Sequence, residues 1–534
     1  MPVTHVINID LATVKVPEAD GQQALTRILG WGDPVEVVAT TSEDVEIRVD
    51  VFRQLEDGSV KPERVSGFIK ARNGIKPAAI VTPIKESKVL KIDFVDVQQG
   101  DGSVIETPKG KVITIDGGDN QLFARYLANR FRGTSKSKPK EIDCMLITHG
   151  DADHFLGLTK IHESETDPHL ETQKWKRLFI HPMRVFHNGL VKRPTKRNGV
   201  TLKETELLGA TKKVKDPVTQ KDITLITGLE SNLLNVPDEE MNEPFKDWKA
   251  ALKDYKTRGP ITFRNLQIGD DNQFDFLADE NIKVHVLGPL PTTVGSVTGL
   301  KFLGNPPEGP RIGQESLNTR VVGFSGASAS HTINGHSIIF RLNYGRFNFL
   351  FTGDLNDEAG RALALEHNQG HLSLQADVFK VPHHGSADFS GAFVQAVAPV
   401  ISVISSGDES ARKEFIHPRA TIVGSLGKLS RVEEPLIFIT ELVAFFNAEG
   451  FTDPEFHKIS NGEAVIKDGK AVLNPKAKKR FFAFSRAAFG LVMVRTDGDR
   501  LLVYTNSGQE TLKEAYAYVI NQFGKPEPAP VRKV

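Results

Sequence analysis

A dense group of candidate metal ligands lies in one short stretch of the chain. His149, Asp151, Asp153 and His154 fall within six consecutive residues, with the spacing H-x-D-x-D-H. Imidazole nitrogens together with carboxylate oxygens are the ligands expected for Zn²⁺, Mn²⁺ or Fe²⁺. A capped surface turn with several carboxylates would show the same residues. Taken alone, the segment leaves two interpretations open, a metal site in a tight loop after a strand and a polar turn.

Two later segments favour the metal site. Asp354 follows the strongly apolar run 347–351, and His383 and His384 follow the apolar run 376–381. A carboxylate at the point where a buried strand emerges is costly unless another group pairs with it. Three separate strand ends that each deliver His or Asp therefore predict a metal site assembled at one edge of a sheet.

The elements that would position these side chains are short strands alternating with helical stretches, a pattern typical of an α/β fold. A hairpin turned at Tyr344-Gly345 is predicted within 336–356, and a helix is predicted over 357–367. Further strands are expected in 88–118 (two strands), before 149–154, and in 282–290, 376–386 and 399–409.

The two ends of the chain have patterns of their own. Apolar and polar residues alternate on both sides of Asp57-Gly58, which predicts a hairpin within a small β-rich, SH3-like module at 1–88. Near the other end, 489–508 predicts a hairpin turned at Asp497-Gly498. Residues 511–534 are expected to form an amphipathic helix followed by a disordered tail.

Residues 89–510 are expected to form the main domain, interrupted by a polar insertion at about 160–282. Within this insertion, 174–197 carries eight Lys and Arg residues and no acidic one, which favours contact with a phosphate backbone. A solvated surface loop is the alternative interpretation. The candidate nucleic-acid-binding residues are Lys192, Arg193, Lys196 and Arg197, and the candidate stacking groups are Trp175, Phe179 and Phe186.

Composition restricts the class of protein. The 534 residues can bury a sizeable core, so neither a disulfide nor a metal is needed merely to hold the fold. The 67 basic residues equal the 67 acidic ones, which does not support a global electrostatic grip on nucleic acid. The single cysteine, Cys144, excludes an intramolecular disulfide and a cysteine-rich zinc site. We find no secretory signal and no apolar run of about 18 residues, so we expect a cytoplasmic protein.

Seven motifs occur in order along the chain: DVQQGDG (96–102), ITIDGG (113–118), THGDADHFLGL (148–158), NGHS (334–337), LFTGD (350–354), KVPHHGS (380–386) and HP (417–418). Together they resemble the metallo-β-lactamase superfamily and, more narrowly, the hydrolase domain of ComEC-type competence proteins in a soluble stand-alone form. The resemblance implies an αββα sandwich with a metal site at one rim. ComEC-type proteins are membrane channels for DNA uptake, and this chain shows no membrane segment, so the transport role is not expected to carry over.

The resemblance implies a centre with two divalent ions, Zn²⁺ or Mn²⁺. Its ligands would be His149 and Asp151 on the first ion, Asp153, His154 and His384 on the second, and Asp354 between the two. The commoner family pattern has a second His where Asp151 stands, and a carboxylate there favours Mn²⁺ relative to an all-histidine site. Asn334 stands where that pattern has another ligand His, so His336 and His331 are candidate substitutes for the third ligand of the first ion.

The resemblance also implies supporting roles. Asp153 and His383 would take part in catalysis, with His383 contacting the phosphate of the substrate. Asp116 would orient a ligand histidine, a role that carboxylates often take beside metal sites. Ser386 and His417 would line the pocket.

We therefore expect a metal-dependent hydrolase that cleaves phosphodiesters, a nuclease or nucleotide phosphodiesterase, with a metal-bridging water as the nucleophile. Two alternatives stay open. One is a hydrolase of another ester, such as a phosphorylcholine-type phosphodiester, a lactone or a thioester, and the other is a non-catalytic binding module with a structural metal. The expected partner is DNA or another phosphodiester substrate.

Overall fold

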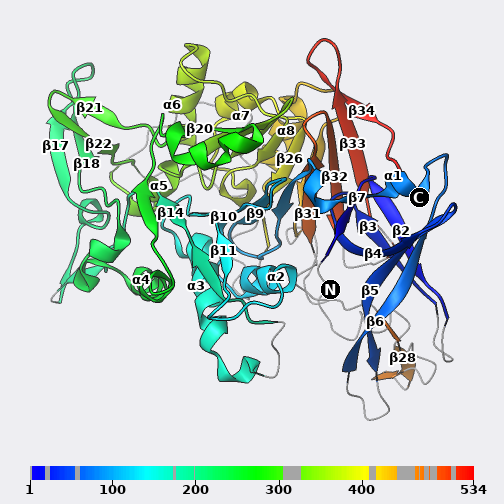
Figure 1. Cartoon of the computed structure of the whole chain (residues 1–534). Helices are drawn as coiled ribbons and strands as arrows, with labels where there is room; N and C mark the ends of the chain where they lie inside the picture. Colours follow the sequence, from blue (N-terminus) through cyan, green and yellow to red (C-terminus); the bar gives the residue numbers. More distant parts are fainter. Residues whose placement is uncertain are drawn as a thin grey trace. The chain divides into compact units, whose positions relative to one another are not determined.

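The computed structural model describes residues 3–18, 24–54, 60–171, 176–197, 199–304, 326–407, 417–441, 464–467, 470–473, 480–481, 490–506, 511 and 513–534 (Figure 1). The chain forms two compact units, one made of Met1–Lys91 with Val443–Val534 and the other of Ile92–Leu442. The sequence predicted a main domain at 89–510, whereas the first unit joins the two ends of the chain. Alternation along a sequence indicates strands, but it does not show which distant strands share a core.

The first unit begins with an antiparallel sheet of strand order β3-β2-β6-β5-β4-β1-β7. Its elements are β1 (His5–Ile7), β2 (Leu11–Val16), β3 (Leu25–Gly30), β4 (Pro34–Thr40), β5 (Asp44–Gln54), β6 (Val60–Lys70), α1 (Pro77–Ile80) and β7 (Val81–Pro83). Every second side chain of β5, from Val45 to Val51, is buried, as expected for a strand with one face on the core. β5 pairs with β6 as the predicted hairpin requires, and the turn at Asp57-Gly58 lies outside the described residues. The SH3-like assignment stays a prediction.

The C-terminal end of the chain consists of strands. β31 (Leu491–Thr496) and β32 (Arg500–Asn506) form the hairpin predicted around Asp497-Gly498. The helix predicted at the start of 511–534 is wrong, because β33 (Ala515–Ile520) and β34 (Pro526–Ala529) continue this antiparallel sheet. Tyr, Val and Ile favour strands, and periodicity alone does not distinguish a short apolar helix from a strand. The end is not a disordered tail either, since Val534 is buried and its N–H donates to Leu11 O at 3.1 Å.

The second unit contains two sheets. The first has the strand order β19-β14-β12-β10-β9-β8, with parallel pairing from β10 through β19. Its elements are β8 (Leu90–Phe94), β9 (Gly102–Glu106), β10 (Val112–Asp116), β12 (Cys144–Leu146), β14 (Arg184–His187) and β19 (Thr262–Asn265), with helices α2 (Leu122–Arg130) and α3 (Ala152–Thr166). The segment 88–118 thus holds three strands where two were predicted.

The second sheet of this unit has the order β20-β23-β24-β25-β26-β27, with parallel pairing from β24 through β27. Its elements are β20 (Ile282–Gly288), β23 (Ile339–Tyr344), β24 (Phe347–Phe351), β25 (Val378–Lys380), β26 (Ile401–Ile404) and β27 (Leu436–Ile439), with helices α6 (Asp357–Asn368), α7 (Gly391–Val397) and α8 (Ala420–Lys428). The predicted hairpin at Tyr344-Gly345 and the helix over 357–367 are confirmed. The three helices pack on this sheet through a shared core that includes Leu363, Phe379 and Phe393 (Figure 1).

Aromatic rings join the two sheets face to face. The Phe94 ring of β8 stacks on Phe351 of β24 with ring centroids 6.0 Å apart, and Phe351 stacks on Phe340 of β23 at 4.8 Å. Aromatic side chains bury much apolar surface and favour such offset contacts. The unit is therefore a mixed α/β structure of two packed sheets with helices, consistent with the predicted fold class.

The predicted insertion at 160–282 is not one excursion from the fold. β14 and β19, both inside this range, are integral strands of the first sheet, because β14 pairs in parallel with β12 and β19 pairs with β14. The remaining elements around this range are β11 (Lys140–Ile142), β13 (Ile180–Pro182), β15 (Lys196–Arg197), β16 (Val200–Thr201), β17 (Thr211–Lys215), β18 (Asp222–Ile226), α4 (Glu243–Lys256), β21 (Thr292–Val294), β22 (Val297–Lys301) and α5 (Ala329–Gly335). The segments around β14 and β19 are polar, so the sequence did not indicate that these two short strands are part of the sheet.

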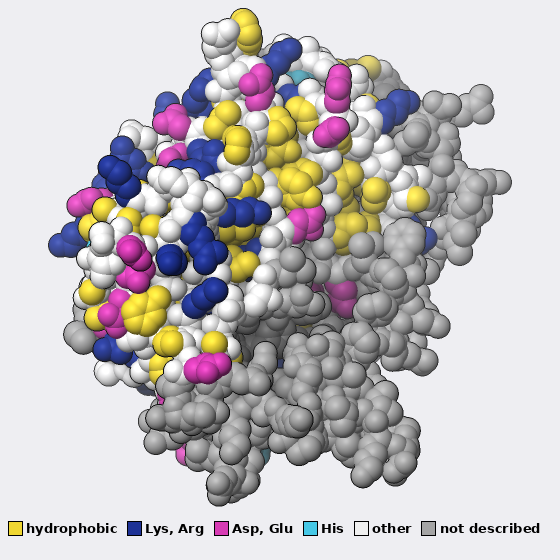
Figure 2. Space-filling view, turned by 90° about the vertical axis from the view of Figure 1, so that its right-hand side faces the viewer, with side chains coloured by type: hydrophobic (Ala, Val, Ile, Leu, Met, Phe, Trp, Pro, Cys, Tyr) yellow, Lys and Arg dark blue, Asp and Glu magenta, His cyan; other side chains and the backbone are white. Residues whose placement is uncertain are grey.

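The surface in Figure 2 carries Lys and Arg side chains with Asp and Glu side chains among them, in keeping with the equal numbers of basic and acidic residues. In the described part of the chain, no helix has both the length and the apolar character needed to cross a membrane.

Candidate metal centre

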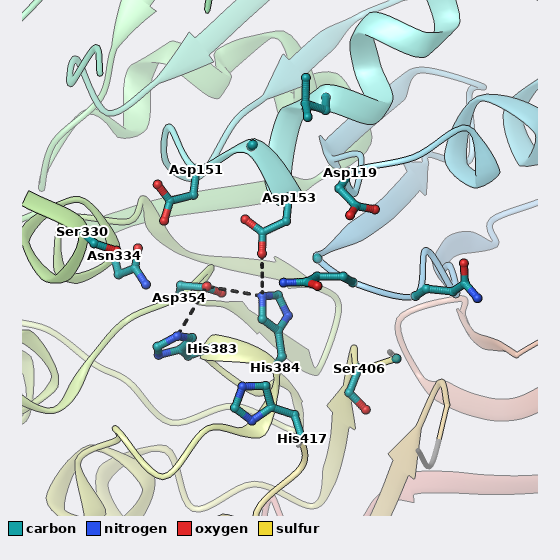
Figure 3. Close-up of a pocket in the computed structure, with 16 residues that line it drawn as sticks. Asp119, Asp151, Asp153, Ser330, Asn334, Asp354, His383, His384, Ser406 and His417 are labelled. Atoms are coloured by element: carbon teal, nitrogen blue, oxygen red, sulfur yellow. Dashed lines mark ion pairs between the residues drawn. The ribbon is translucent and has the colours of Figure 1, made fainter. Parts of the chain in front are cut away.

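The carboxyl ends of several parallel strands deliver the candidate ligands. β10 ends at Asp116, β12 leads to His149, β24 leads to Asp354, and β25 leads to His383 and His384. Because the carboxyl ends of parallel strands lie at one edge of a sheet, side chains far apart in the sequence meet there. Figure 3 shows the side chains of Asp153, Asp354 and His384 pointing toward one another.

The H-x-D-x-D-H segment is a strand-to-helix turn rather than the predicted loop. α3 begins at Ala152, directly after Asp151, so Asp153 and His154 lie in its first turn. A carboxylate is favourable there because the first N–H groups and the helix dipole attract negative charge. Gly100 packs against this turn with φ +101°, and a Cβ on it would lie 1.8 Å from the Asp153 carbonyl oxygen. Only glycine fits at that distance, and the next residue, Asp101, is thereby delivered to the centre.

Four side chains lie around what we call the second metal position, where Asp153 groups with His154 and His384, and Asp354 lies beside both histidines. His154 Nε2 lies 3.3 Å from Asp354 Oδ1, and His384 Nε2 lies 3.3 Å from Asp354 Oδ2 and 3.7 Å from Asp153 Oδ2. Among the described residues, the two Nε2 atoms and Asp354 Oδ1 are buried with no hydrogen-bond partner outside this group. Buried polar atoms need partners, and nitrogen and oxygen donors so arranged fit Zn²⁺ or Mn²⁺.

Both ligand histidines have a buried carboxylate behind them. Asp116 Oδ2 lies 2.9 Å from His154 Nδ1, and Asp116 also accepts from the N–H and hydroxyl of Thr148. His384 Nδ1 lies 3.2 Å from Ser405 O and 3.3 Å from Asp101 Oδ1, and Asp101 Oδ2 forms an ion pair with Lys380, whose side chain is 4% exposed. Because carboxylate and carbonyl oxygens only accept, His154 Nδ1 donates to Asp116 and His384 Nδ1 donates to Ser405 O, which leaves each Nε2 facing the metal position.

The carboxylates of the cluster favour a positive charge between them. Burial opposes a positive charge on His154, but Asp354 and Asp116 outweigh it and raise its pKa well above the ordinary value. Asp354 and Asp101 do the same to the pKa of His384. Burial also opposes a negative charge on Asp354, yet His384 and His154 lower its pKa well below the ordinary value. Metals bind neutral imidazole, so a divalent ion would take the place of these protons among the carboxylates.

The first metal position would be built around His149. Its Nδ1 faces the Ser337 hydroxyl at 3.4 Å, and its Nε2 lies 3.9 Å from Asp151 Oδ2 and 4.0 Å from Asp354 Oδ2. Burial and the neighbouring His154 lower the pKa of His149 well below its ordinary value, which keeps this imidazole neutral. Neutral imidazole is a common metal ligand.

Asp151 is engaged by two other groups. Lys192, from the loop after β14, forms an ion pair with Asp151 Oδ1. In the amide orientation that matches donors to acceptors, Asn334 Nδ2 donates to Asp151 Oδ2 at 3.0 Å and to Ser330 O at 3.2 Å. An amide N–H does not bind a cation. The first position therefore fits an ion less well than the second.

Left-handed backbone conformations gather at this centre. Gln98, Asp116, His383 and His384 have φ between 50° and 62°, and they are four of the eight non-glycine residues with positive φ in the described chain. Such conformations cost about 1–3 kcal/mol each and tend to occur at functional sites. Here they turn three of the four side chains toward or behind the metal positions.

A cavity of about 440 Å³ opens onto the second position. Figure 3 shows His383, His384 and His417 along one side of it, with the His383 and His417 rings 6.2 Å apart. Burial and the nearby His384 and His383 lower the pKa of His417 to about 3, which keeps this ring neutral. The other residues that line the cavity are Gln98, Gln99, Gly100, Asp119, Asp151, Ala152, Asp153, Leu156, Ser330, Asn334, Asp354, Ser406 and Gly407.

Three of the predicted site residues face other partners. His336 Nε2 lies 2.7 Å from Lys301 O, and burial lowers its pKa to about 4. His331 Nε2 lies 3.1 Å from Asp388 Oδ2, and the Ser386 hydroxyl accepts from the Asp388 N–H at 3.2 Å. The structure thus brings neither His331 nor His336 to the place that Asn334 occupies.

The basic segment is partly neutralised by an acidic neighbour. Arg193 and Arg197 form ion pairs with Glu240 at 2.9 Å and 2.6 Å. Phe186 is buried against Phe274 and so is not an exposed stacking group, while Lys174 and Trp175 lie outside the described residues. Lys196 is exposed on β15. Spacing within the segment did not show that Glu240 would lie beside it.

Three residues of the centre were not predicted to act at the metal site. Asp101 and Lys380 belong to the motifs DVQQGDG and KVPHHGS, and their pairing joins residues 279 positions apart. Lys192 was assigned to nucleic acid, whereas it binds Asp151. The sequence of β25 could have indicated the pairing of Lys380 with Asp101. The strand is buried and ends in Lys380, and a buried ammonium group needs a charged partner.

Replacing Asp116 by Asn is expected to raise the metal dissociation constant by about 10–100-fold, because His154 loses the carboxylate that orients its ring. Isothermal titration of the metal-free protein with Mn²⁺ measures this change. Asp143→Asn is a matched control, since Asp143 Oδ2 accepts from the Val112 N–H at 2.8 Å, at the other end of β10. Equal affinity in wild type and Asp116→Asn would remove the proposed role of Asp116.

The sequence matches a known protein family. The family model of the metallo-beta-lactamase superfamily matches residues 95–407, which is more than half of the chain and includes every residue placed at the two metal positions. No curated protein sequence matches the chain.

Proposed function

The chain belongs to the metallo-β-lactamase superfamily, whose members are mostly metal-dependent hydrolases, and on this premise we propose that it hydrolyses phosphodiesters. The observation that carries the proposal is the set of donors at the second metal position, of which His154, His384 and Asp354 are buried and Asp153 is partly exposed. We further propose that the centre can hold up to two divalent ions, Zn²⁺ or Mn²⁺.

The residues of the centre would have different roles in hydrolysis. A bound divalent ion lowers the pKa of a coordinated water and offsets negative charge that develops on phosphoryl oxygens. Asp116 and the carbonyl of Ser405 keep the ligand histidines oriented, and Asp354 faces both metal positions. His383 lies at the cavity with its Nε2 4.0 Å from Asp354 Oδ2 and its side chain 24% exposed, where it can donate a hydrogen bond to a substrate oxygen.

The cavity lining favours a phosphodiester over a lactone or thioester. Most lining side chains are polar, and Ala152 and Leu156 contribute the apolar ones. Pockets for acylated substrates bury apolar chains against apolar walls, whereas polar convergent groups suit a charged and strongly hydrogen-bonding ligand. A phosphodiester offers such groups on both sides of the bond to be cleaved.

A panel of substrates tests the proposal. The purified full chain with Mn²⁺ or Zn²⁺ is incubated with bis(p-nitrophenyl) phosphate, single- and double-stranded DNA, p-nitrophenyl phosphorylcholine, a lactone and a thioester. We expect turnover of a phosphodiester that is lost in Asp153→Ala. Hydrolysis confined to the lactone or thioester contradicts the phosphodiester assignment, and binding of metal without any turnover indicates a binding module.

For DNA as the substrate, we propose that the exposed hairpin β15–β16 contacts the phosphate backbone. Replacing Lys196 and Arg197 with Gln is expected to weaken DNA binding and to lower the slope of log affinity against log salt by about 0.9 per lost contact on duplex, or about 0.7 on single strands. The measurement is a salt series of binding isotherms. Turnover of bis(p-nitrophenyl) phosphate should stay unchanged, because neither residue lines the cavity. Unaltered salt dependence would show that the segment is a solvated loop.

A further inference from the structure

We infer that the ammonium group of Lys192 stands in for a cation beside the first metal position, so that this position binds an ion weakly and in competition with Lys192. The inference concerns metal binding alone. It holds whichever ester the protein hydrolyses.

The two positions differ in the donors that they can offer. At the second position, the described structure places four side chains, and both histidines have a carboxylate behind them. At the first position, His149 Nε2 lies 4.0 Å from Asp354 Oδ2, an oxygen that also lies 3.3 Å from His384 Nε2, while Asp151 is engaged by Lys192 and Asn334. An ion there would have to share Asp354 with the second position.

Both oxygens of Asp151 are engaged, one in an ion pair and the other in a hydrogen bond. Lys192 binds Oδ1, and the Asn334 amide donates to Oδ2 at 3.0 Å. To coordinate Asp151, an incoming ion must break at least one of these contacts and then remain close to the ammonium group. Like charges at short range repel, and the repulsion is weakly screened because the side chains of Lys192 and Asp151 are only 28% and 17% exposed.

The backbone holds Lys192 in place. Lys192 O accepts from Asn242 N at 2.9 Å, and the next residue, Arg193, donates its N–H to Leu207 O at 2.8 Å. Asn242 in turn caps α4, because its side chain accepts from Phe245 N. These two contacts fix the peptide group that follows Lys192, so its contact with Asp151 differs from the chance meeting of a surface lysine with a carboxylate.

The experiment is a titration of the metal-free full chain with Mn²⁺ by calorimetry, with metal content measured after equilibrium dialysis. Groups hydrogen-bonded to a ligand change metal affinity by about 10–100-fold each, so we expect two dissociation constants that differ by at least about 100-fold in wild type. In Lys192→Met the weaker constant should fall by about 10–100-fold, while the stronger one stays unchanged. Lys192→Arg keeps the cation and should behave as wild type.

Lys213→Met is the matched control, since Lys213 is exposed on β17 and its loss should leave both constants unchanged. Two ions of equal affinity in wild type would overturn the inference without recourse to any variant. So would a Lys192→Met titration that matches wild type. Because hydrolysis is not measured, failure of the phosphodiester proposal and failure of this inference are separate results.

Discussion

Replacing His154 with Ala is expected to lower kcat/KM for bis(p-nitrophenyl) phosphate by more than about 100-fold, the upper end of the range for losing a group that merely supports a ligand. His154 is buried, its Nδ1 is held by Asp116 at 2.9 Å, and its Nε2 faces Asp354 at 3.3 Å. A methyl group in its place offers no donor. Asp153→Ala should have the same effect, because its carboxylate faces the same position from the first turn of α3.

The matched control for this prediction is His371→Ala. His371 is 63% exposed and pairs with Glu366, away from the metal positions, so activity and metal content should equal those of wild type. In His154→Ala, elemental analysis should show loss of the tightly bound ion while circular dichroism reports a folded chain. Near-wild-type turnover of the phosphodiester in His154→Ala or Asp153→Ala would remove the centre as the catalytic site.

Removal of the metal with a chelator is expected to abolish hydrolysis, and addition of Mn²⁺ or Zn²⁺ should restore it. Metal that binds only the folded chain also stabilises it, by about 2.7 kcal/mol when the free ion is at 100 times its dissociation constant. Thermal unfolding of the metal-free and reloaded protein measures this difference. A protein that keeps full activity after its metal content has been shown to be negligible would exclude metal-dependent hydrolysis.

The stabilisation by metal should grow as the pH rises. In the metal-free chain the pKa of His154 and of His384 is raised, so their contribution to stability is fully present below the unfolded value of about 6.5 and is lost as the pH rises through the folded pKa. An ion replaces these protons, so its affinity increases over the same range. The difference in Tm between loaded and metal-free protein should therefore be larger at about pH 9 than at about pH 6. A difference that shrinks with pH would contradict this account.

Local patterns predicted the parts of the structure that depend on neighbours in the sequence. The hairpin at Tyr344-Gly345 and the helix that follows it were predicted because turn residues and helical spacing are visible within about a dozen residues. The three strand ends with His or Asp were also visible, since each follows an apolar run. Asp354 follows a buried strand, and a carboxylate at such a place is costly unless another group pairs with it, so its position in the sequence already indicates a partner.

Features that depend on distant pairing were missed. The contact of Lys192 with Asp151, of Lys380 with Asp101 and of Arg193 with Glu240 each joins segments that only the fold brings together. The segments that form β14 and β19 were predicted to belong to a polar insertion, because each strand is only four residues long. The prediction of a helix at the C-terminus has another cause, because β33 pairs with its sequence neighbours and its short apolar run does not distinguish a helix from a strand, whereas the contact of Val534 with Leu11 is distant.

The second metal position draws its ligands from both sheets of its unit, and this has a consequence for the rates of folding and unfolding. His154 and His384 are 230 residues apart in the sequence, and each follows a strand of a different sheet. Closing so long a loop comes late and is slow, so the ion can bind only after both sheets have formed and packed. Once bound, it links the two layers, and they cannot separate until it leaves. Unfolding of the loaded protein should then wait for release of the ion, so its unfolding rate in denaturant should fall as the concentration of free metal rises.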